Sequence, residues 1–200
     1  MLDVMKVLFY FDKRINTEKG RKMIKTDYDL LTQQAEALTK DCPHLVANLA
    51  NISALLFTTI EDINWVGFYL LEEASAKLIL GPFQGNPACI ELPVGKGVCG
   101  TAAAEDRTQL VPDVHQFPGH IACDSASRSE IVIPVHKKRN GVSATSSNNS
   151  NDGPKENTPE LTSTVIGVLD IDSPSLSRFT EEDKVGLEKL VAILEHTILF

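Results

Sequence analysis

The spacing of apolar residues changes twice along the chain, and this change restricts the folds that the chain can adopt. In residues 27–60 apolar side chains recur every three or four positions, as on one side of a helix. In residues 65–172 they form short runs rich in branched and aromatic residues, which are typical of strands. A helical spacing returns after Thr180. Helices grouped at the two ends of a run of strands predict an α+β domain with an antiparallel sheet.

Turn-forming residues divide this pattern into elements. Pro43 is expected to separate two helices, and Gly95 to Ala104 to form a glycine-rich turn that enters a short helix. Residues 81–85 are expected to form a loop because of their composition. The last helix is expected to begin with a capping box at Thr180. The expected strands are residues 65–71, 77–80, 91–94, 108–111, 130–136 and 165–172.

Two segments are expected to lie outside the packed domain, which is assigned to residues 25–198. Residues 1–24 are mixed in charge and have no sustained period, so they are interpreted as an N-terminal extension. Residues 139–163, between the last two strands, contain almost no apolar side chains. Such a segment cannot bury enough surface to offset its ordering entropy, and a disordered hairpin insertion is predicted.

Composition narrows the classes of partner and compartment. A formal net charge of −8 disfavours nucleic acid, which usually requires a basic surface. The chain has no apolar run long enough to span a bilayer, and no cleavage site follows the short apolar run near its start. The expected compartment is therefore the cytoplasm, with the nucleus left open. Thiols stay reduced there, so cysteines tend to be buried, metal-bound or catalytic.

Acidic side chains are expected to meet at one end of the sheet. Asp170 and Asp172 are two positions apart in a strand, and Glu130 opens the strand expected to pair with it. Carboxylates held close together raise one another's pKa, which can provide a proton donor at neutral pH. They would also bind the ammonium group of a ligand. A solvated strand end with turn-forming aspartates is the alternative explanation.

An aromatic pair accompanies these acids. Trp65 and Tyr69 share one face of a strand with Gly67 between them, which predicts a slot for an apolar or sulfur-containing ligand beneath the two rings. Ordinary core packing of the same rings is the alternative.

The glycine-rich turn does not indicate a dinucleotide cofactor. Its Gly-x-Gly-x-x-Gly spacing follows a proline and opens only a short helix, unlike a nucleotide-binding fingerprint. Backbone N–H groups at the helix start suit a ligand carboxylate instead. No metal is expected, because the cysteines and histidines lack the spacing of common zinc modules. A zinc site built from distant cysteines and His120 is an alternative.

Three of the four cysteines lie in expected loops or turns, and this placement favours thiol redox chemistry over an inert core role. They are Cys89, Cys99 and Cys123, whereas Cys42 lies in the break between the first two helices. His120, three residues before Cys123, would lower the pKa of that thiol, or is a loop histidine bound by backbone. Buried cysteines acting as small apolar residues are the alternative.

Several short motifs, each present once, are distributed over about residues 27–195, apart from the insertion. They are Asn64-Trp65-Val66-Gly67-Phe68-Tyr69, Gly81-Pro82-Phe83-Gln84-Gly85 with Ala88-Cys89, Val94 to Ala102, Val111 to His115, Gly119 to Asp124, Ser127 to Val132, Ile166 to Ser173, and Arg178 to Thr180. This set closely resembles the free methionine-(R)-sulfoxide reductases, a family built on the GAF domain. The sequence contexts of the three cysteines are specific to these reductases, whereas GAF domains in general share only the fold and faint patterns.

The resemblance implies a single GAF domain, with a six-stranded antiparallel sheet flanked by helices and a pocket closed by the loops of Cys89 and Cys123. It implies reduction of free methionine-(R)-sulfoxide, no bound cofactor, and thioredoxin as reductant, supplied by thioredoxin reductase and NADPH. It also implies a role in the oxidative stress response, and it is compatible with a homodimer. The family's substrate-binding aromatic and acidic residues correspond to Trp65, Tyr69, Glu130, Asp170 and Asp172.

The hypothesis for the chemistry gives each cysteine a role. Cys123 attacks the sulfoxide sulfur, a protonated acid such as Glu130 supplies a proton, and the enzyme is left with a sulfenic acid. Cys89 is the first choice for the resolving thiol. Cys99 is the alternative for either role, because a helix start would lower its pKa. The competing function is a non-catalytic GAF domain that senses a small molecule, although such domains usually accompany an output module for which the chain leaves no room.

Overall fold

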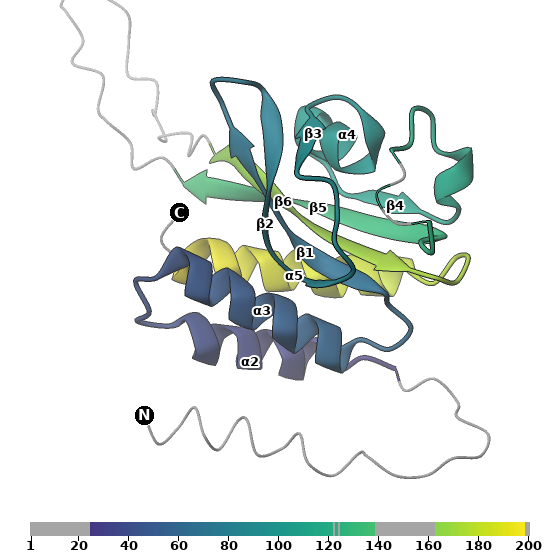
Figure 1. Ribbon diagram of the computed structural model, residues 1–200. Coiled ribbons are helices and arrows are strands. Elements are labelled where there is room, and N and C mark those ends of the chain that lie inside the picture. Colours follow the sequence, from purple (N-terminus) through teal and green to yellow (C-terminus); the bar gives the residue numbers. More distant parts are fainter. Residues whose placement is uncertain (1–24, 122, 124, 139–162, 199–200) are drawn as a thin grey trace, which may run out of the picture.

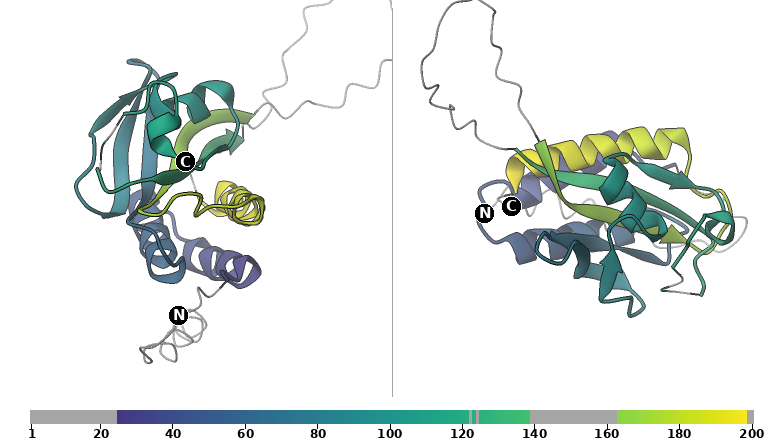
Figure 2. Two further views of the ribbon diagram at one scale, coloured as in Figure 1. Left: turned by 90° about the vertical axis from the view of Figure 1, so that its right-hand side faces the viewer. Right: turned by 90° about the horizontal axis from the view of Figure 1, so that it is seen from above.

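A six-stranded antiparallel sheet forms the centre of the computed structural model, which describes residues 25–121, 123, 125–138 and 163–198. The strand order is β3-β2-β1-β6-β5-β4. Helices α2, α3 and α5 cover one face, and α4 with its neighbouring loops lies on the other (Figures 1 and 2). The expected α+β class and the antiparallel sheet are confirmed. None of the helices in this described part of the chain is both long and apolar enough to cross a membrane.

The elements follow the order expected from the spacing of apolar residues. The helices are α2 Tyr28–Thr39, α3 Leu45–Thr59, α4 Gly97–Glu105, α5 Glu181–Thr197 and the short 3-10 helix η2 Val114–Gln116. The strands are β1 Trp65–Glu72, β2 Lys77–Gly85, β3 Glu91–Pro93, β4 Gln109–Val111, β5 Ser129–Lys138 and β6 Ser163–Ser173. The extension at residues 1–24 and the insertion, apart from its last residue, lie outside the described residues.

The expectation that residues 81–85 form a loop is wrong, because these residues continue β2. Residues 83–85 pair with residues 67–65 of β1, and the register between the two strands shifts between Gly67 and Tyr69. β2 pairs with β3 only from Lys77 to Ile79, and Leu80 adds one backbone hydrogen bond to Ile90. From Gly81 on, no strand in the described part of the chain pairs with this edge of β2. Pro82 lacks a backbone N–H, and a free edge is where a strand tolerates that loss.

The two faces of the sheet bury different cores. The face under α2, α3 and α5 is aliphatic, with side chains such as Val66, Ile131 and Leu169 fully buried. The opposite face carries Trp65 and Tyr69 together with smaller apolar residues beneath α4. Alternation along each strand produces this division, since neighbouring residues point to opposite faces. The second face therefore holds all the polar groups of the candidate site.

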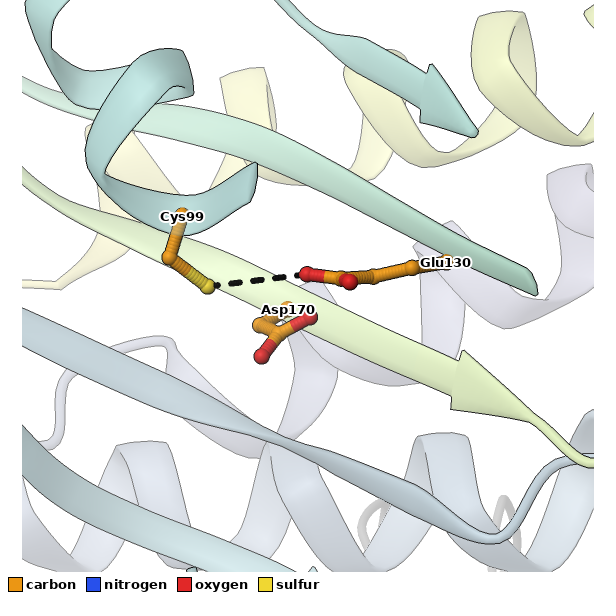
Figure 3. Close-up of side chains that lie close together, drawn as sticks. All are labelled: Cys99, Glu130 and Asp170. Atoms are coloured by element: carbon orange, nitrogen blue, oxygen red, sulfur yellow. Dashed lines mark hydrogen bonds between the residues drawn. The ribbon is translucent and has the colours of Figure 1, made fainter. Parts of the chain in front are cut away.

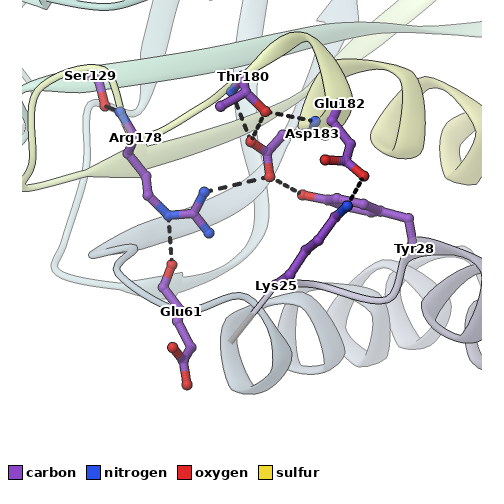
Figure 4. A network of polar contacts seen from close by, with 8 residues as sticks. All are labelled: Lys25, Tyr28, Glu61, Ser129, Arg178, Thr180, Glu182 and Asp183. Carbon is purple, nitrogen blue, oxygen red and sulfur yellow. Dashed lines mark hydrogen bonds and ion pairs between the residues drawn. The ribbon is translucent and has the colours of Figure 1, made fainter. Parts of the chain in front are cut away.

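A polar cluster fixes the helical layer to the start of β5 (Figure 4). Tyr28 on α2 donates a hydrogen bond of 2.7 Å to Asp183 on α5. The guanidinium of Arg178 donates to the backbone carbonyl of Glu61 at 2.9 Å and lies 3.5 Å from Asp183. The backbone N–H of Arg178 donates to Ser129 at the first position of β5. Asp183 also completes the expected capping box of α5.

Candidate active site

Strand register places the acids and the aromatic residues on the face that α4 covers. Glu130 on β5 lies opposite Asp172 on β6, and Asp172 lies opposite Trp65 on β1. Asp170, two positions from Asp172, points to the same face, as does Tyr69. The expected convergence of the three acids is therefore present in the structure.

A pocket lies between this sheet face, the start of α4 and the loop that carries Cys123. It is lined by Trp65, Tyr69, Ala88, Leu92, Lys96, Gly97, Val98, Cys99, His120, Ile121, Cys123, Ser127, Glu130, Asp170 and Asp172. All five residues expected to bind substrate are among them. Cys99 and Cys123 also line the pocket, whereas Cys89 is not part of its lining.

The glycine-rich turn positions Cys99 over the acids. Gly97 has a φ of +64°, which few other residues adopt easily. A Cβ atom at Gly100 would lie 2.2 Å from the carbonyl oxygen of Pro93, so only glycine lets α4 approach β3 this closely. The glycines at positions 97 and 100 are thus explained by backbone conformation and local packing.

Cys99, Glu130 and Asp170 form a compact buried cluster (Figure 3). The Sγ atom of Cys99 donates to Glu130 across 3.8 Å, and one donor atom from each of the three side chains lies within 4.8 Å of the others. Asp170 is 6% exposed, and its Oδ1 atom has no hydrogen-bond partner among the described residues. A buried polar atom without a partner is costly, and a bound ligand would satisfy it.

Burial controls the protonation of this cluster. It raises the pKa of Glu130 well above the usual value, and the nearby charges of Asp170 and Asp172 raise it further. Burial also raises the pKa of Asp170 to about 6, against hydrogen bonds from Cys99 and Glu130 that lower it. Two acids this close share a proton near neutral pH, because both cannot ionise cheaply in a buried site.

The pKa of Cys99 departs from the sequence-based expectation. Burial raises it well above that of a free thiol, and the charges of Asp170 and Glu130 add to this shift. The expectation that the helix start lowers the pKa of Cys99 is therefore wrong. Desolvation and two neighbouring acids outweigh the short helix α4, so Cys99 is held as a neutral thiol.

Cys89 and Cys123 are joined by a disulfide, with Cα atoms 5.3 Å apart and a sequence separation of 34 residues. Both side chains are half-buried, and the carbonyl oxygen of Cys89 accepts a hydrogen bond from the Tyr69 hydroxyl at 3.0 Å. Cys42 and Cys99 are free. This pairing matches the first choice of resolving partner for Cys123.

The aromatic residues form a wall of the pocket and leave no slot beneath the rings. Trp65 stacks on Tyr69 and on Phe83, with ring centroids 5.8 and 5.3 Å apart. A Cβ atom at Gly67 would lie 2.4 Å from Phe83 and 2.6 Å from the Trp65 ring, so these two side chains already fill the space expected for a ligand. The third ring, Phe83, was missed because its segment was expected to be a loop.

Two basic residues at the pocket, His120 and Lys96, differ from expectation. Burial lowers the pKa of His120, and the charge of His115 lowers it further, so a neutral His120 gives Cys123 little charge stabilisation at pH 7. Lys96 was missed by the sequence reasoning, although it lines the pocket as the N-cap residue of α4. Lysine is a poor N-cap residue because its charge opposes the helix dipole, and this conflict is the signal that could have singled it out.

Fold and site together define a GAF domain with a cysteine pair at its ligand pocket, and the GAF domain family model matches residues 41–198. The chain belongs to the free methionine-R-sulfoxide reductases, a family of oxidoreductases. It is 47% identical over 177 residues to free methionine-R-sulfoxide reductase of Escherichia coli, and the alignment covers 88% of this chain and 92% of that protein.

Solved structures of free methionine-R-sulfoxide reductases also resemble this chain. The reduced form of fRMsr of Staphylococcus aureus superimposes with a TM-score of 0.72 at 48% identity, covering 89% of this chain and 99% of that one. Free methionine-R-sulfoxide reductase from Neisseria meningitidis, in complex with its substrate, superimposes with a TM-score of 0.70 at 38% identity, covering 90% of this chain and 95% of that one.

Proposed function

We propose that this protein reduces free L-methionine (R)-S-oxide to L-methionine, using Cys123 and Cys89 as the redox pair. The observation that carries the proposal is the buried acid pair, Glu130 and Asp170, which shares a pocket with Cys123. A sulfoxide oxygen must gain protons before it can leave as water. Acids with a raised pKa supply such protons at neutral pH.

The pocket offers a partner to each part of a free amino acid. Trp65 and Tyr69 present an apolar wall to the methyl and thioether groups. Asp172, the third acid of the pocket, binds the ammonium group in this proposal. The backbone N–H groups at the start of α4, with Lys96 beside them, bind the carboxylate. The Glu130–Asp170 pair then faces the sulfoxide.

The proposed reaction consumes two thiols for each sulfoxide. The Cys123 sulfur attacks the sulfoxide sulfur, oxygen passes to the cysteine with a proton from the Glu130–Asp170 pair, and methionine leaves. The resulting sulfenic acid on Cys123 condenses with the Cys89 thiol and releases water, which forms the disulfide. Two electrons from thioredoxin then restore both thiols, and NADPH with thioredoxin reductase reduces thioredoxin again.

Placement in the pocket supports this assignment of roles. Cys123 lines the pocket and Cys89 does not, so Cys123 is the member of the pair that a bound sulfoxide can reach. Cys99 remains the alternative for either role, since it also lines the pocket beside the acids. Replacing each of the three cysteines by serine separates these roles in a single turnover without reductant. A variant that releases no methionine lacks the nucleophile, and one that releases it once and then stalls lacks the resolving thiol.

Charges at the two ends of the pocket favour the free amino acid over methionine sulfoxide in a peptide. A peptide-linked substrate has neither the ammonium group nor the carboxylate. It would form no ion pair with the half-buried Asp172 or the exposed Lys96, and would therefore bind more weakly.

The deciding experiment measures NADPH consumption by the protein with thioredoxin and thioredoxin reductase, using free methionine (R)-sulfoxide. We expect turnover with this substrate and little with its (S) epimer or with a peptide sulfoxide. Binding of the sulfoxide without turnover would instead favour a non-catalytic sensor. Stoichiometric zinc in the purified protein would favour a metal enzyme, for which Cys99, Glu130 and Asp170 have suitable donor distances.

The setting of the reaction is part of the same proposal. We place it in the cytoplasm or nucleus, where thioredoxin operates, as a contribution to the oxidative stress response. A homodimer is the proposed oligomer, and light scattering of the purified protein tests it by giving a mass near twice 21.9 kDa.

A further inference from the structure

The residue next to the disulfide is an exposed isoleucine. Ile90 follows Cys89 directly, and 71% of its surface is accessible. Among the large apolar side chains of the described residues, this exposed fraction is the highest, above Val46 at 69% and Val185 at 63%. Exposing an isoleucine forgoes the free energy that its burial would contribute. Single exposed apolar residues are common, and what distinguishes Ile90 from the others is its position next to the redox pair.

The backbone on both sides of this position is fixed. The carbonyl oxygen of Cys89 accepts a hydrogen bond from the Tyr69 hydroxyl at 3.0 Å. The carbonyl oxygen of Ile90 accepts one from the backbone N–H of Leu80 at 2.9 Å. Ile90 is therefore held at the surface by the chain's own hydrogen bonds, rather than by a loosely placed loop.

The segment that leads to Ile90 lacks charge, and a charged pair follows it. The chain has 27 acidic and 19 basic residues among 200, yet residues 84–90 contain none. The next residue, Glu91, forms an ion pair with Lys77. An apolar residue bordered by polar and charged groups resembles the centre and rim of a protein contact.

The disulfide identifies the chemistry of the partner. Thiol–disulfide exchange requires a thiolate to touch one sulfur of the bond, so a protein reductant must cover the surface around Cys89 or Cys123. Cys123 faces the substrate pocket, whereas Cys89 is outside the pocket lining and next to Ile90. The surface available to a protein is thus the one that carries Ile90.

We propose that Ile90 is the docking anchor for the protein dithiol that reduces this enzyme, and that the dithiol attacks Cys89. The inference rests on the proposed function, in which the reductant belongs to the thioredoxin class. Its thiolate forms a bond to the Cys89 sulfur, the Cys89–Cys123 bond breaks, and its electron pair leaves with Cys123, which takes up a proton. The second thiol of the reductant then displaces Cys89, so that the reductant becomes the disulfide and both cysteines of the enzyme are reduced.

This order of attack has a consequence for turnover. Cys123 is released first, inside the pocket, while Cys89 is still held in the mixed disulfide. The nucleophile is therefore restored on the side where the next sulfoxide binds.

The test compares two reductants on the full-length protein at saturating methionine (R)-sulfoxide. Ile90→Ala is expected to lower kcat/KM for thioredoxin about tenfold, and Ile90→Asp to lower it further. Turnover supported by dithiothreitol should stay as in the wild type, since a small dithiol needs no docking surface. Val185→Ala removes a similarly exposed side chain from α5, on the far side of the sheet, and should change neither rate.

A second measurement identifies the sulfur that is attacked. A thioredoxin variant without its second active-site cysteine should trap a mixed disulfide at Cys89, which peptide mass spectrometry can locate. Wild-type kcat/KM for thioredoxin in both Ile90 variants, an equal loss with dithiothreitol, or trapping at Cys123 would overturn the proposal. Failure of the wild type to turn over with either reductant would instead contradict the proposed function itself.

Discussion

Cys99 and Glu130 face each other across 3.8 Å, with their side chains almost completely buried. The charge of Glu130 raises the pKa of Cys99, whereas the hydrogen bond from the Cys99 thiol lowers the pKa of Glu130 against the larger effects of burial and of the two aspartates. The pair is therefore stable only while at least one proton stays in the site. This property suits the site to the proposed role of proton donor and also lowers the stability of the folded state, and the first prediction uses both consequences.

Glu130→Gln should stabilise the folded protein while it removes most of the activity. Because burial raises the folded-state pKa of Glu130, its ionisation opposes folding above the pKa of the unfolded chain. The stability gained by the variant should be absent near pH 4, grow as pH rises, and reach about 1–2 kcal/mol at neutral pH. Turnover should fall on the order of a hundredfold, since glutamine cannot donate the proton.

Denaturant unfolding at several pH values, together with the NADPH-coupled assay, measures both effects. Glu36→Gln is the control, because Glu36 lies on the exposed side of α2 and its loss should change neither quantity. Wild-type turnover in Glu130→Gln would remove Glu130 from the proposed chemistry.

Gly100→Ala should damage the site more than its small volume suggests. The new methyl group would need the space of the Pro93 carbonyl oxygen, 2.2 Å away, so α4 must shift and carry Cys99 with it. We expect a large loss of turnover and a clear drop in Tm. Gly119→Ala is the matched control, because that residue has a φ of +71° but no atom within 4 Å of the added Cβ. Gly100 has no positive φ, so a loss of stability in Gly100→Ala no larger than that in Gly119→Ala would contradict the effect of crowding.

His136 should stabilise the fold more at low pH than at high pH. Its ring lies 2.6 Å from Asp106 at the end of α4 and 2.7 Å from Glu195 on α5. Partial burial lowers the pKa of His136, but the hydrogen bonds and charges of these two acids outweigh it and raise the pKa above 6.5. A raised histidine pKa gives stability that is complete below the unfolded pKa and is lost as pH rises through the folded value.

The difference in unfolding free energy between wild type and His136→Gln should therefore shrink from pH 6 to pH 9. His44→Gln provides the comparison, since His44 is exposed and its side chain makes no cap hydrogen bond to α3. A difference that stays constant with pH would show that His136 acts only through neutral hydrogen bonds.

The sequence predicted the parts of the site that follow from strand periodicity. Asp170 and Asp172 had to share a face once their segment was a strand, and pairing with the strand of Glu130 brought the third acid to them. Local spacing says nothing about burial by a distant element, however. The pKa of Cys99 depends on α4 closing over the acids, which is a tertiary effect, and an expectation from the helix start alone gave the wrong direction.

Phe83 shows a second limit of sequence reasoning. Glycine and proline at positions 81, 82 and 85 indicated a loop, yet the strand continues there because it pairs with β1, and its outer edge, which does not pair with β3 there, tolerates Pro82. Edge position is decided by the strand order of the whole sheet, so composition could not reveal it.

Lys96→Ala should weaken binding of the free amino acid with little effect on the chemical step. Lys96 is the N-cap residue of α4, and its side chain accepts no cap hydrogen bond because an ammonium group has no acceptor. Its charge lies at the positive end of the helix, where it costs about 0.3–1 kcal/mol of helix stability. Replacing it should thus leave stability unchanged or raise it.

The variant should raise KM for free methionine (R)-sulfoxide about tenfold while kcat stays near the wild-type value, if Lys96 pairs with the substrate carboxylate. Methionine sulfoxide amide, which lacks the carboxylate charge, separates binding from other effects: wild type and Lys96→Ala should bind it equally weakly. Lys40→Ala, an exposed lysine at the end of α2, serves as control and should change no kinetic constant. An equal rise in KM for both substrates would assign Lys96 to the shape of the pocket instead. A selective rise for the free acid would support a site in which Lys96 binds the carboxylate and Asp172 the ammonium group of a zwitterion.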